Sequence, residues 1–273
     1  MRKVYKPNPF VLVSTNTGAM ILNHLDCHKT PMGSYGVGYQ FLQTGGFDMD
    51  EISSVIKLLG LCRERFGDGV VALDCGANIG AHTIEWGLEM LGWGGGDSGQ
   101  YAGRVIAFEA QEYIYYALCG NIALNNCFNV KAIFGALGNA KKQGEMLEIP
   151  SVDYTKAASF GSLELKFDAQ NEFIGQKVNY QDTQKVPLIS IDSLGLQRVD
   201  LIKIDVEKME LEVLEGAKKT IKSHKPLLII EIIKSDKEKI KSFLKGYKFF
   251  DFGMNLLCIV EDSPILQYIV PAK

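Results

Sequence analysis

Hydrophobic and polar positions follow two recurring patterns along most of the chain. From Val70 onward, short runs of apolar and often β-branched residues are separated by longer stretches whose apolar positions recur at helical spacing. Such apolar runs are typical of strands buried on both faces of a parallel sheet, and the longer stretches are typical of the helices that cover it. We therefore expect an α/β fold built on a doubly wound, mostly parallel, Rossmann-like sheet.

The individual elements can be placed in chain order. Helical stretches between successive strands indicate right-handed βαβ crossovers. The run at 227–232, in which Glu231 is the one charged residue, is typical of a strand near the sheet centre. The predicted strands are 70–73, 105–108, 130–134, 201–204 and 227–232, and the predicted helices are 79–91, 113–124 and 213–221.

The last two apolar runs predict a different feature. Residues 247–252 and 256–260 are separated only by Gly253, Met254 and Asn255, a spacing typical of a β-hairpin. We expect an antiparallel C-terminal hairpin at one edge of the sheet.

Two segments outside the βαβ pattern set the expected domain organisation. Residues 1–69 are expected to form an N-terminal lobe or cap that ends in a helix at 51–66. Residues 70–273 are expected to form the main domain, with an insertion at 139–187 that faces the substrate. Extra strands are predicted within this insertion at 146–149 and 163–167.

Composition and charge narrow the class of protein. Of the 273 residues, 47% are hydrophobic and 22% are charged, a balance typical of a globular protein. The formal net charge of −3 lacks the positive footprint of a nucleic-acid-binding protein. No apolar run approaches the roughly 18 residues of a membrane-spanning helix, and the N-terminus does not resemble a secretory signal. We expect a cytoplasmic protein without a nucleic-acid partner or a membrane span. No sequence pattern indicates the oligomeric state, and a homodimer is compatible with the sequence.

The strongest chemical signal is DCGANIG at 74–80, directly between a predicted strand and a predicted helix. Gly76 and Gly80 let the backbone approach a ligand closely, and the helix N-terminus offers free N–H groups to a carboxylate. Asp74 could accept a hydrogen bond from an ammonium group. The turn therefore suits an adenosyl amino acid, with a purely structural turn as the alternative. The candidate cofactor contacts here are Asp74, Gly76, Asn78 and Gly80.

Glu109 ends the second predicted strand. A carboxylate at this place can accept hydrogen bonds from both hydroxyls of a ribose, with a solvated acid as the alternative. Glu109 follows the glycine turn by more than the usual spacing of about 20 residues, and a glycine-rich surface loop predicted at 92–103 accounts for the excess. Ala136, just after the third predicted strand, is a further candidate cofactor contact.

A dinucleotide or nucleoside-triphosphate site fits this turn less well. The dinucleotide fingerprint needs glycine at 74, 76 and 79, where the chain has Asp74, Gly76 and Ile79. The phosphate-loop sequence G-x-x-x-x-G-K-[ST] is absent. An NAD-dependent oxidoreductase is therefore the less favoured alternative.

Several segments occur in the order known from one family. They are VALDCGANIGAHT at 71–83, AFE at 107–109, NIALN at 121–125 with NV at 129–130, IDSL at 191–194, VDLIKIDVE at 199–207, VLEGA at 213–217 and EI at 231–232. Together they closely resemble the FkbM family of methyltransferases. The resemblance implies a class I methyltransferase domain that uses S-adenosylmethionine. It also implies O-methylation of a hydroxyl on a sugar, a glycolipid or a polyketide-like small molecule.

One residue departs from the family pattern. Lys208 follows Asp-Val-Glu where the family usually has glycine. A side chain there could narrow the pocket or change its charge, which affects the acceptor more than the cofactor. A non-catalytic module that keeps the cofactor pocket is the alternative that this departure raises.

Three residues are candidates for the group that takes up the proton of an acceptor hydroxyl. Asp205 is the first, because it ends the fourth strand, where open α/β sheets place ligands. His82, in the first turn after the glycine turn, is the second, with a packed or surface histidine as an equally good interpretation. Glu231 is the third, because an interior carboxylate without a partner is costly. Asp205 and Glu207 alone are weak evidence for a metal site, and no metal is expected.

Overall fold

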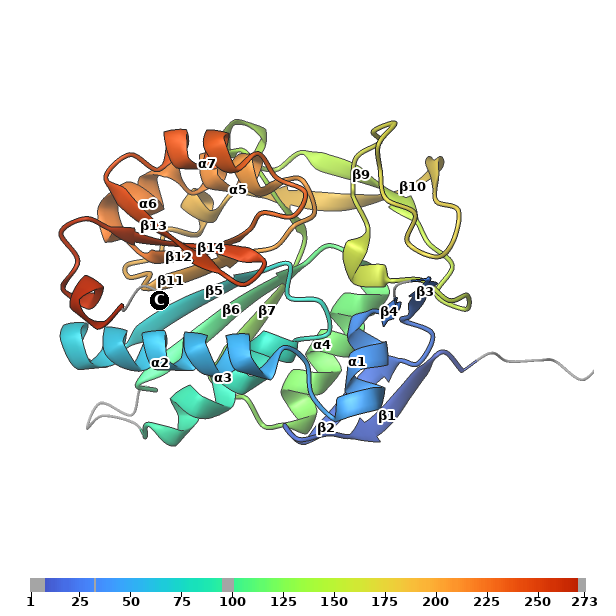
Figure 1. The fold of residues 1–273 in the computed structure, drawn as a ribbon, viewed down its shortest axis with the longest axis horizontal. Coiled ribbons are helices and arrows are strands. Elements are labelled where there is room, and N and C mark those ends of the chain that lie inside the picture. The colour runs from blue at the N-terminus through green and yellow to red at the C-terminus, as the bar shows by residue number, and fades with distance from the viewer. Residues whose placement is uncertain (1–7, 32, 95–100, 270–273) are drawn as a thin grey trace, which may run out of the picture. The chain divides into compact units, whose positions relative to one another are not determined.

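The computed structural model describes residues 8–31, 33–94 and 101–269 (Figure 1). Residues 1–7 of the N-terminal segment and half of the glycine-rich loop predicted at 92–103, residues 95–100, lie outside the described residues. The chain forms two compact units. The first unit comprises Met1–Phe47 and Glu148–Lys185, and the second, which we call the sheet unit, comprises Asp48–Leu147 and Val186–Lys273.

The sheet unit is built on a sheet of seven strands. The strands are β5 (Val70–Cys75), β6 (Gly103–Glu109), β7 (Val130–Phe134), β11 (Leu201–Ile204), β12 (Leu227–Glu231), β13 (Tyr247–Phe252) and β14 (Asn255–Val260). Their order is β13-β14-β12-β11-β5-β6-β7. The strands from β12 to β7 run parallel, whereas β14 pairs antiparallel with β12 and with β13. The predicted mostly parallel sheet and its C-terminal hairpin are confirmed.

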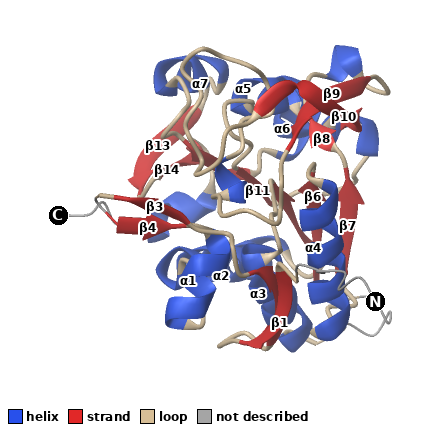
Figure 2. Cartoon of the chain, turned by 90° about the vertical axis from the view of Figure 1, so that its right-hand side faces the viewer, coloured by secondary structure: helices blue, strands red, loops and turns tan. Residues whose placement is uncertain are grey.

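Helices cover both faces of this sheet because its side chains alternate between the faces. Val71 and Leu73 pack in a core with one set of helices, and Val70 and Ala72 pack in a core with another set. The first set is α5 (Glu210–Gly216), α6 (Lys218–His224) and α7 (Lys237–Phe243). The second set is α2 (Met49–Phe66) and α3 (Ala81–Gly92), together with α4 (Glu112–Leu124), whose Leu118 packs in a smaller core with Ala77 and Ala107. Figure 1 shows the two sets on opposite sides of the strands, and Figure 2 shows the same layers from the side. The sheet is therefore doubly wound.

The helix expected at 213–221 consists of two short helices that meet at Ala217. Val213, Leu214, Ala217 and Ile221 all pack against the sheet, as their spacing predicted. Gly216 lies so close to the carbonyl oxygen of Gly138 that a Cβ there would come within 1.9 Å of it. The short elements that complete the sheet unit are β8 (Ala136–Leu137) and the 3-10 turns Ala140–Lys142, Ile191–Leu194 and Pro264–Tyr268.

The predicted helix at 51–66 is present as α2, but it belongs to the sheet unit and not to an N-terminal lobe. Ile52, Val55 and Leu59 are almost fully buried and pack in the same core as Val70. The apolar stripe of α2 therefore covers the sheet, which places the boundary of the first unit before this helix.

The first unit combines the N-terminal residues with most of the predicted insertion. Its N-terminal elements are β1 (Phe10–Ser14), β2 (Ala19–Asn23), β3 (His28–Thr30), β4 (Gly33–Tyr35) and α1 (Val37–Thr44). These form two antiparallel hairpins, β1 with β2 and β3 with β4, followed by the helix. The insertion supplies a 3-10 turn at Phe160–Ser162 and residues of β9 (Met146–Ser151) and β10 (Asn179–Ile189), strands that each have residues in both units.

The strand predicted at 146–149 is confirmed as part of β9, whereas the strand predicted at 163–167 is wrong. Residues 163–167 form no regular element, although Leu163 and Leu165 are buried. The carbonyl of Glu164 accepts a hydrogen bond from the Tyr180 hydroxyl at 2.9 Å, and not from a neighbouring strand. Side-chain hydrogen bonds thus satisfy this backbone without a ladder. No helix among the described residues is long and apolar enough to cross a membrane.

Candidate functional site

The segment between β5 and α3 turns through left-handed backbone conformations. The φ angles are 86° at Gly76, 51° at Asn78 and 93° at Gly80, a region that glycine adopts without steric cost. The N–H groups of Gly76 and Ala77 donate to the carbonyl of Phe108 on β6 at 3.1 and 2.8 Å. The predicted turn is therefore a fixed structure bonded to the neighbouring strand.

The turn is also in direct contact with the end of β11. A Cβ added to Gly76 would lie 1.8 Å from the carbonyl oxygen of Asp205, so only glycine fits here. The N–H of Asp205 donates to the carbonyl of Cys75 at 3.0 Å. Asp205 is thus held against the glycine turn by its own backbone.

Asp74 is buried, with 1% of its surface exposed. Its Oδ2 accepts a hydrogen bond from the Thr83 hydroxyl at 2.5 Å. Its Oδ1 is also buried and has no hydrogen-bond partner among the described residues. A buried carboxylate oxygen without a donor is costly, and the ammonium group of an amino acid would supply one. This oxygen therefore fits the ammonium group of S-adenosylmethionine, whereas the N–H groups of residues 76–80 are already hydrogen-bonded within the protein.

Glu109 faces the same turn from the end of β6. Its Oε2 accepts from the N–H of Asn78 at 3.0 Å, and its Oε1 accepts from the N–H of Gln111 at 2.7 Å. Burial raises the pKa of Glu109 to about 7, although the backbone N–H groups oppose the rise. Each carboxylate oxygen has a second lone pair, so ribose hydroxyls can still donate to it. The N–H of Gly135 donates to the Glu109 carbonyl at 3.0 Å, which places the buried Ala136 close by.

Lys203 and Asp205 form an ion pair at the end of β11. Lys203 lies opposite Asp74 in the register of β11 with β5 and is 3% exposed. Its Nζ donates to Asp205 Oδ2 at 2.9 Å, while the Asp205 side chain is 36% exposed. Burial alone would lower the pKa of Lys203, but the carboxylates of Asp205, Asp74 and Glu51 raise it above its usual range. Lys203 is therefore a buried cation that holds one oxygen of Asp205.

His82 lies on the face of the sheet that α2 and α3 cover. Its Nε2 is 3.3 Å from Oε1 of Glu51 on α2, and its ring meets that of Trp86 at a centroid distance of 5.5 Å. Glu51 Oε2 accepts from the Asn255 side chain at 2.8 Å. Burial favours a higher pKa for Glu51, but His82 and Lys203 outweigh it and lower the pKa. His82 therefore belongs to a buried polar network.

Sequence reasoning did not identify Glu51 and Asn255 as partners of this network. A signal for Glu51 exists, because it lies one turn before Val55 on the helix and therefore beside the buried stripe. No local pattern points from Glu51 to His82, since the two residues are on different helices.

Two glutamates lie near Asp205 at the ends of β11 and β12. Glu231 is 9% exposed, and its Oε1 accepts from the N–H of Ile233 at 3.2 Å. Burial raises the pKa of Glu231 to about 7, and the charges of Asp205 and Glu210 act in the same direction. Oε2 of Glu231 is buried and has no hydrogen-bond partner within the described ranges.

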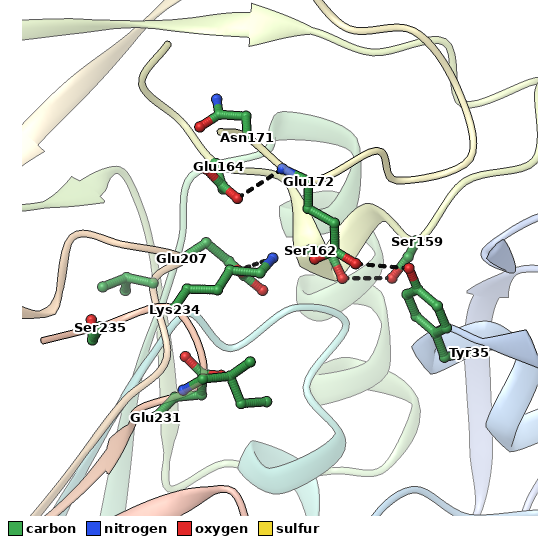
Figure 3. A network of polar contacts seen from close by, with 12 residues as sticks. Tyr35, Ser159, Ser162, Glu164, Asn171, Glu172, Glu207, Glu231, Lys234 and Ser235 are labelled. Atoms are coloured by element: carbon green, nitrogen blue, oxygen red, sulfur yellow. Dashed lines mark hydrogen bonds and ion pairs between the residues drawn. The ribbon is translucent and has the colours of Figure 1, made fainter. Parts of the chain in front are cut away.

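Glu207 forms an ion pair with Lys234, whose Nζ lies 2.7 Å from Glu207 Oε2 (Figure 3). Burial raises the pKa of Glu207 to about 8, although Lys234 opposes the rise. Lys208, the residue that departs from the family pattern, has a φ of 73°, and Glu207 has a φ of 53°. The position of Lys208 thus has a backbone that favours glycine. In the described part of the chain, no group of three histidine, cysteine or acidic side chains could hold a metal ion.

The structure brings most of the predicted residues to one edge of the sheet. Asp74 and the turn, Glu109, Asp205 and Glu231 lie at the carboxyl ends of adjacent strands. His82 lies on the covered face and is linked to them through Glu51 and Lys203. The individual roles of these residues remain predictions.

A family model described as the methyltransferase FkbM domain matches residues 74–251. The solved structure of methyltransferase FkbM from Methylobacillus flagellatus KT is 19% identical, with 70% of this chain and 43% of that chain covered and a TM-score of 0.41. No curated protein sequence matches the chain.

Two further solved structures are similar. The Pyrococcus abyssi tRNA (uracil-54, C5)-methyltransferase, in complex with S-adenosyl-L-homocysteine, is 9% identical over 92% of this chain and 44% of that chain, with a TM-score of 0.43. The precorrin-6y C5,15-methyltransferase from Geobacter metallireducens GS-15 is 14% identical over 76% of this chain and 85% of that chain, with a TM-score of 0.40. The chain thus spans less than half the length of the FkbM and tRNA enzymes.

Proposed function

The chain belongs to the FkbM methyltransferase family, and from that premise we propose that it transfers the methyl group of S-adenosylmethionine to a hydroxyl of a small molecule or carbohydrate. The cofactor follows from the family, whose members use S-adenosylmethionine. The hydroxyl acceptor, a sugar, a glycolipid or a polyketide-like molecule, is the part that the proposal adds.

The observation that carries the proposal is the contact between Asp205 and the glycine turn. The backbone of Asp205 donates to Cys75 and lies against Gly76, while its carboxylate remains partly exposed. A carboxylate at this place is next to the predicted cofactor site and is accessible to a second substrate. A general base needs both features.

Different residues bind the cofactor and take up the proton of the acceptor. Asp74 and the turn bind the amino-acid part of the cofactor, and Glu109 accepts from the ribose hydroxyls. S-adenosylmethionine, when bound, supplies a methyl carbon that its sulfonium activates. Asp205 takes up the proton of the acceptor hydroxyl, and Lys203 fixes the orientation of Asp205 through the bond at 2.9 Å. Glu231 and His82 are secondary candidates for contacts with the acceptor.

The charge of the chain favours a small acceptor over a nucleic acid. The formal net charge is −3, whereas binding to a phosphate backbone relies on clustered basic residues. Tritiated S-adenosylmethionine should therefore label hydroxylated small molecules or glycolipids from an extract, and should not label transfer RNA. Label in the RNA fraction alone would contradict this part of the proposal.

Cofactor binding is tested by thermal unfolding with S-adenosylhomocysteine. At 100 times its dissociation constant the ligand should stabilise the protein by about 2.7 kcal/mol, which corresponds to a rise of several degrees in Tm. NADH serves as the control for the oxidoreductase alternative and should have no effect. A rise with NADH and none with S-adenosylhomocysteine would overturn the proposal.

The role of Asp205 is tested by Asp205→Asn, which keeps the size of the side chain and removes its basicity. Loss of a general base typically lowers kcat by about 10²–10⁴-fold, while the Kd of S-adenosylhomocysteine should stay within a few-fold. Asp251→Asn is the control, because Asp251 lies on β13 with a side chain that is 82% exposed. Equal losses in kcat and affinity would make Asp205 a cofactor contact. Binding without transfer to any extract would favour the non-catalytic module.

A further inference from the structure

The first unit contains a chain of hydrogen bonds through His28, Tyr35 and Glu172. His28 and Tyr35 are paired across the hairpin of β3 and β4, and Nδ1 of His28 lies 2.5 Å from the Tyr35 hydroxyl. That hydroxyl donates to Glu172 Oε1 at 2.8 Å (Figure 3). The family model begins at residue 74, so the hairpin is outside the matched region.

This arrangement determines the tautomer of His28. A phenol has one proton, and Tyr35 donates it to Glu172. The oxygen of Tyr35 then accepts from Nδ1 of His28, so in the neutral imidazole the ring proton lies on Nδ1. In that form Nε2 is a hydrogen-bond acceptor, and it has no partner in the part of the chain that the structure describes.

The loop that contains Glu172 is ordered by side-chain hydrogen bonds. Glu164 is 3% exposed, and its Oε1 accepts from the N–H of Glu172 at 3.1 Å. The Asn171 side chain donates to the Lys166 carbonyl at 2.8 Å, and the Tyr180 hydroxyl donates to the Glu164 carbonyl at 2.9 Å. These bonds tie the backbone of Glu172 to residues 164–171 before it and so restrict where its carboxylate holds Tyr35.

Phe173 follows Glu172 and presents an aromatic ring to solvent. Phe173 is 60% exposed. The centroid of its ring is 5.4 Å from that of the His28 ring, at an interplanar angle of 83°. An exposed aromatic ring beside an oriented hydrogen-bond acceptor suits a ligand with an apolar face and hydroxyl groups at its rim. A pyranose ring has both, since its axial C–H groups form a face and its hydroxyls project around it.

We propose that His28 and Phe173 form a binding site for a pyranose-type ring, with Tyr35 and Glu172 as positioning residues. Phe173 stacks on the C–H face of the ring, and Nε2 of His28 accepts from one of its hydroxyls. The inference rests on the proposed function for the identity of the ligand as the methyl acceptor, and it assigns recognition of that acceptor to the first unit.

The binding test uses the full chain with methyl α-D-glucopyranoside, methyl α-D-galactopyranoside and methyl α-D-mannopyranoside as probes. Saturation-transfer NMR should detect at least one of them with a Kd in the millimolar range, and Phe173→Ala should weaken that binding at least tenfold. The matched control is Phe167→Ala, because Phe167 is another exposed phenylalanine of the same loop, 73% exposed, whose ring packs on Tyr180. Binding by none of the probes, or equal losses in the two variants, would overturn the proposal.

The positioning role is tested by Tyr35→Phe, which keeps the ring and removes the hydroxyl. Long-range ¹H–¹⁵N spectra of the wild-type protein should show His28 with its proton on Nδ1, and the variant should show a mixture of tautomers together with weaker sugar binding. A wild-type His28 that has its proton on Nε2 would contradict the proposal. Unchanged Tm values would show that both variants are folded.

Parallel measurements with S-adenosylhomocysteine separate this inference from the proposed function. Phe173→Ala and Tyr35→Phe should keep the wild-type thermal shift with this ligand, because its predicted site lies in the sheet unit. A thermal shift without any sugar binding would overturn the inference alone. Sugar binding without a thermal shift would support the site and overturn the proposed methyl transfer.

Discussion

The two units hold their polar side chains in place by different physical means. In the sheet unit, Asp74, Glu109 and Asp205 lie at the carboxyl ends of parallel strands, so the topology of the sheet brings them to one edge. In the first unit, Asp26 and Glu172 are held by individual hydrogen bonds between loops and hairpins. A site built on a regular sheet can be located from strand ends, whereas a site built on loops depends on pairings between distant residues.

The largest expected loss of stability comes from a substitution at the sheet edge, in the glycine turn. Gly76→Ala places a Cβ 1.8 Å from the carbonyl oxygen of Asp205 in a backbone with a φ of 86°. Because both the clash and the strain act on buried backbone, we expect a loss of about 3 kcal/mol or more in the free energy of unfolding, together with loss of S-adenosylhomocysteine binding. Urea unfolding and calorimetry measure the two effects.

Gly60→Ala is the control for this change. Gly60 lies within α2, and a Cβ there would meet nothing within 4 Å. Alanine should therefore stabilise the helix by about 0.5–1 kcal/mol. A Gly76→Ala protein as stable as the wild type would show that the turn is not the rigid support described above.

The next effect concerns the first unit. Oδ2 and Oδ1 of Asp26 accept from the N–H groups of Gly38 and Phe160 at 2.9 and 3.0 Å. Asn has only one acceptor oxygen, so Asp26→Asn leaves one buried N–H facing an amide donor and should cost about 2 kcal/mol. Urea unfolding at several pH values measures this cost.

Asp26 also gives the first unit a pH dependence of defined sign. Burial raises the pKa of Asp26 from 3.8 to about 6, although its backbone hydrogen bonds oppose the rise. Because the pKa of Asp26 is higher in the folded than in the unfolded protein, its protonation stabilises the fold. This stabilisation is complete below pH 3.8 and is lost as the pH rises through about 6. Relative to Asp26→Asn, the wild type should lose stability over this interval.

The matched control for the pH effect is Asp153→Asn, in the same unit. Bonds from Thr155 and Lys156 lower the pKa of the exposed Asp153 to about 2. The contribution of Asp153 should therefore be present above pH 3.8 and disappear as the pH falls through about 2. If the two variants showed the same sign of pH dependence, the buried position of Asp26 would be contradicted.

A smaller effect tests the buried network of the sheet unit. Glu51→Gln removes the charge that faces His82 and Lys203, and we expect a loss of about 1 kcal/mol. Burial favours a higher pKa for Glu51, but His82 and Lys203 lower it below 4.5. The stabilisation is therefore present above pH 4.5 and is lost as the pH falls through the lowered folded value.

The free energy of unfolding of Glu51→Gln and of a control variant, each measured between pH 3 and 7, tests this network. Glu64→Gln is the control, since Glu64 is exposed on the same helix. The same pH dependence in Glu51→Gln and Glu64→Gln would contradict a stabilising contact between Glu51 and His82, whose Oε1 and Nε2 are 3.3 Å apart.

The smallest expected effect is a gain. Lys208 has a φ of 73°, where a residue with a Cβ costs about 1–2 kcal/mol relative to its preferred conformation. Lys208→Gly removes this strain but increases the entropy of the unfolded chain, and the net gain should be about 0.5–1 kcal/mol. Lys222→Gly, in the exposed part of α6, should instead lose about 1 kcal/mol. Equal losses in the two variants would mean that the backbone at Lys208 is not strained.

The sheet and most of the candidate site could be predicted because their signals are local. Each strand is a continuous apolar run, and Asp74, Glu109 and Asp205 are recognised by their position at the end of such a run. Gly76 was singled out because it lies between a strand and a helix, and the structure adds the reason, which is the approach of Asp205. The order of the segments was sufficient to identify the family.

Other features could not be predicted because they depend on contacts between residues far apart in the chain. The apolar stripe of α2 was evident, but its periodicity does not say which core the stripe covers. The alternating residues at 163–167 suggested a strand, yet Tyr180 supplies the hydrogen bond that a partner strand would have made. The pairing of Glu51 with His82 likewise has no local signal.

The amino-acid sequence by itself determined the strands, their crossovers, the glycine turn and the acids at the sheet edge, because periodicity and backbone preference act over a few neighbouring residues. Only the tertiary structure decided that α2 covers the sheet, that Lys203 bonds Asp205 while Glu51 contacts His82, and that Tyr35 lies between His28 and Glu172. These arrangements depend on burial and on hydrogen bonds between distant segments, which exist only once the chain has folded.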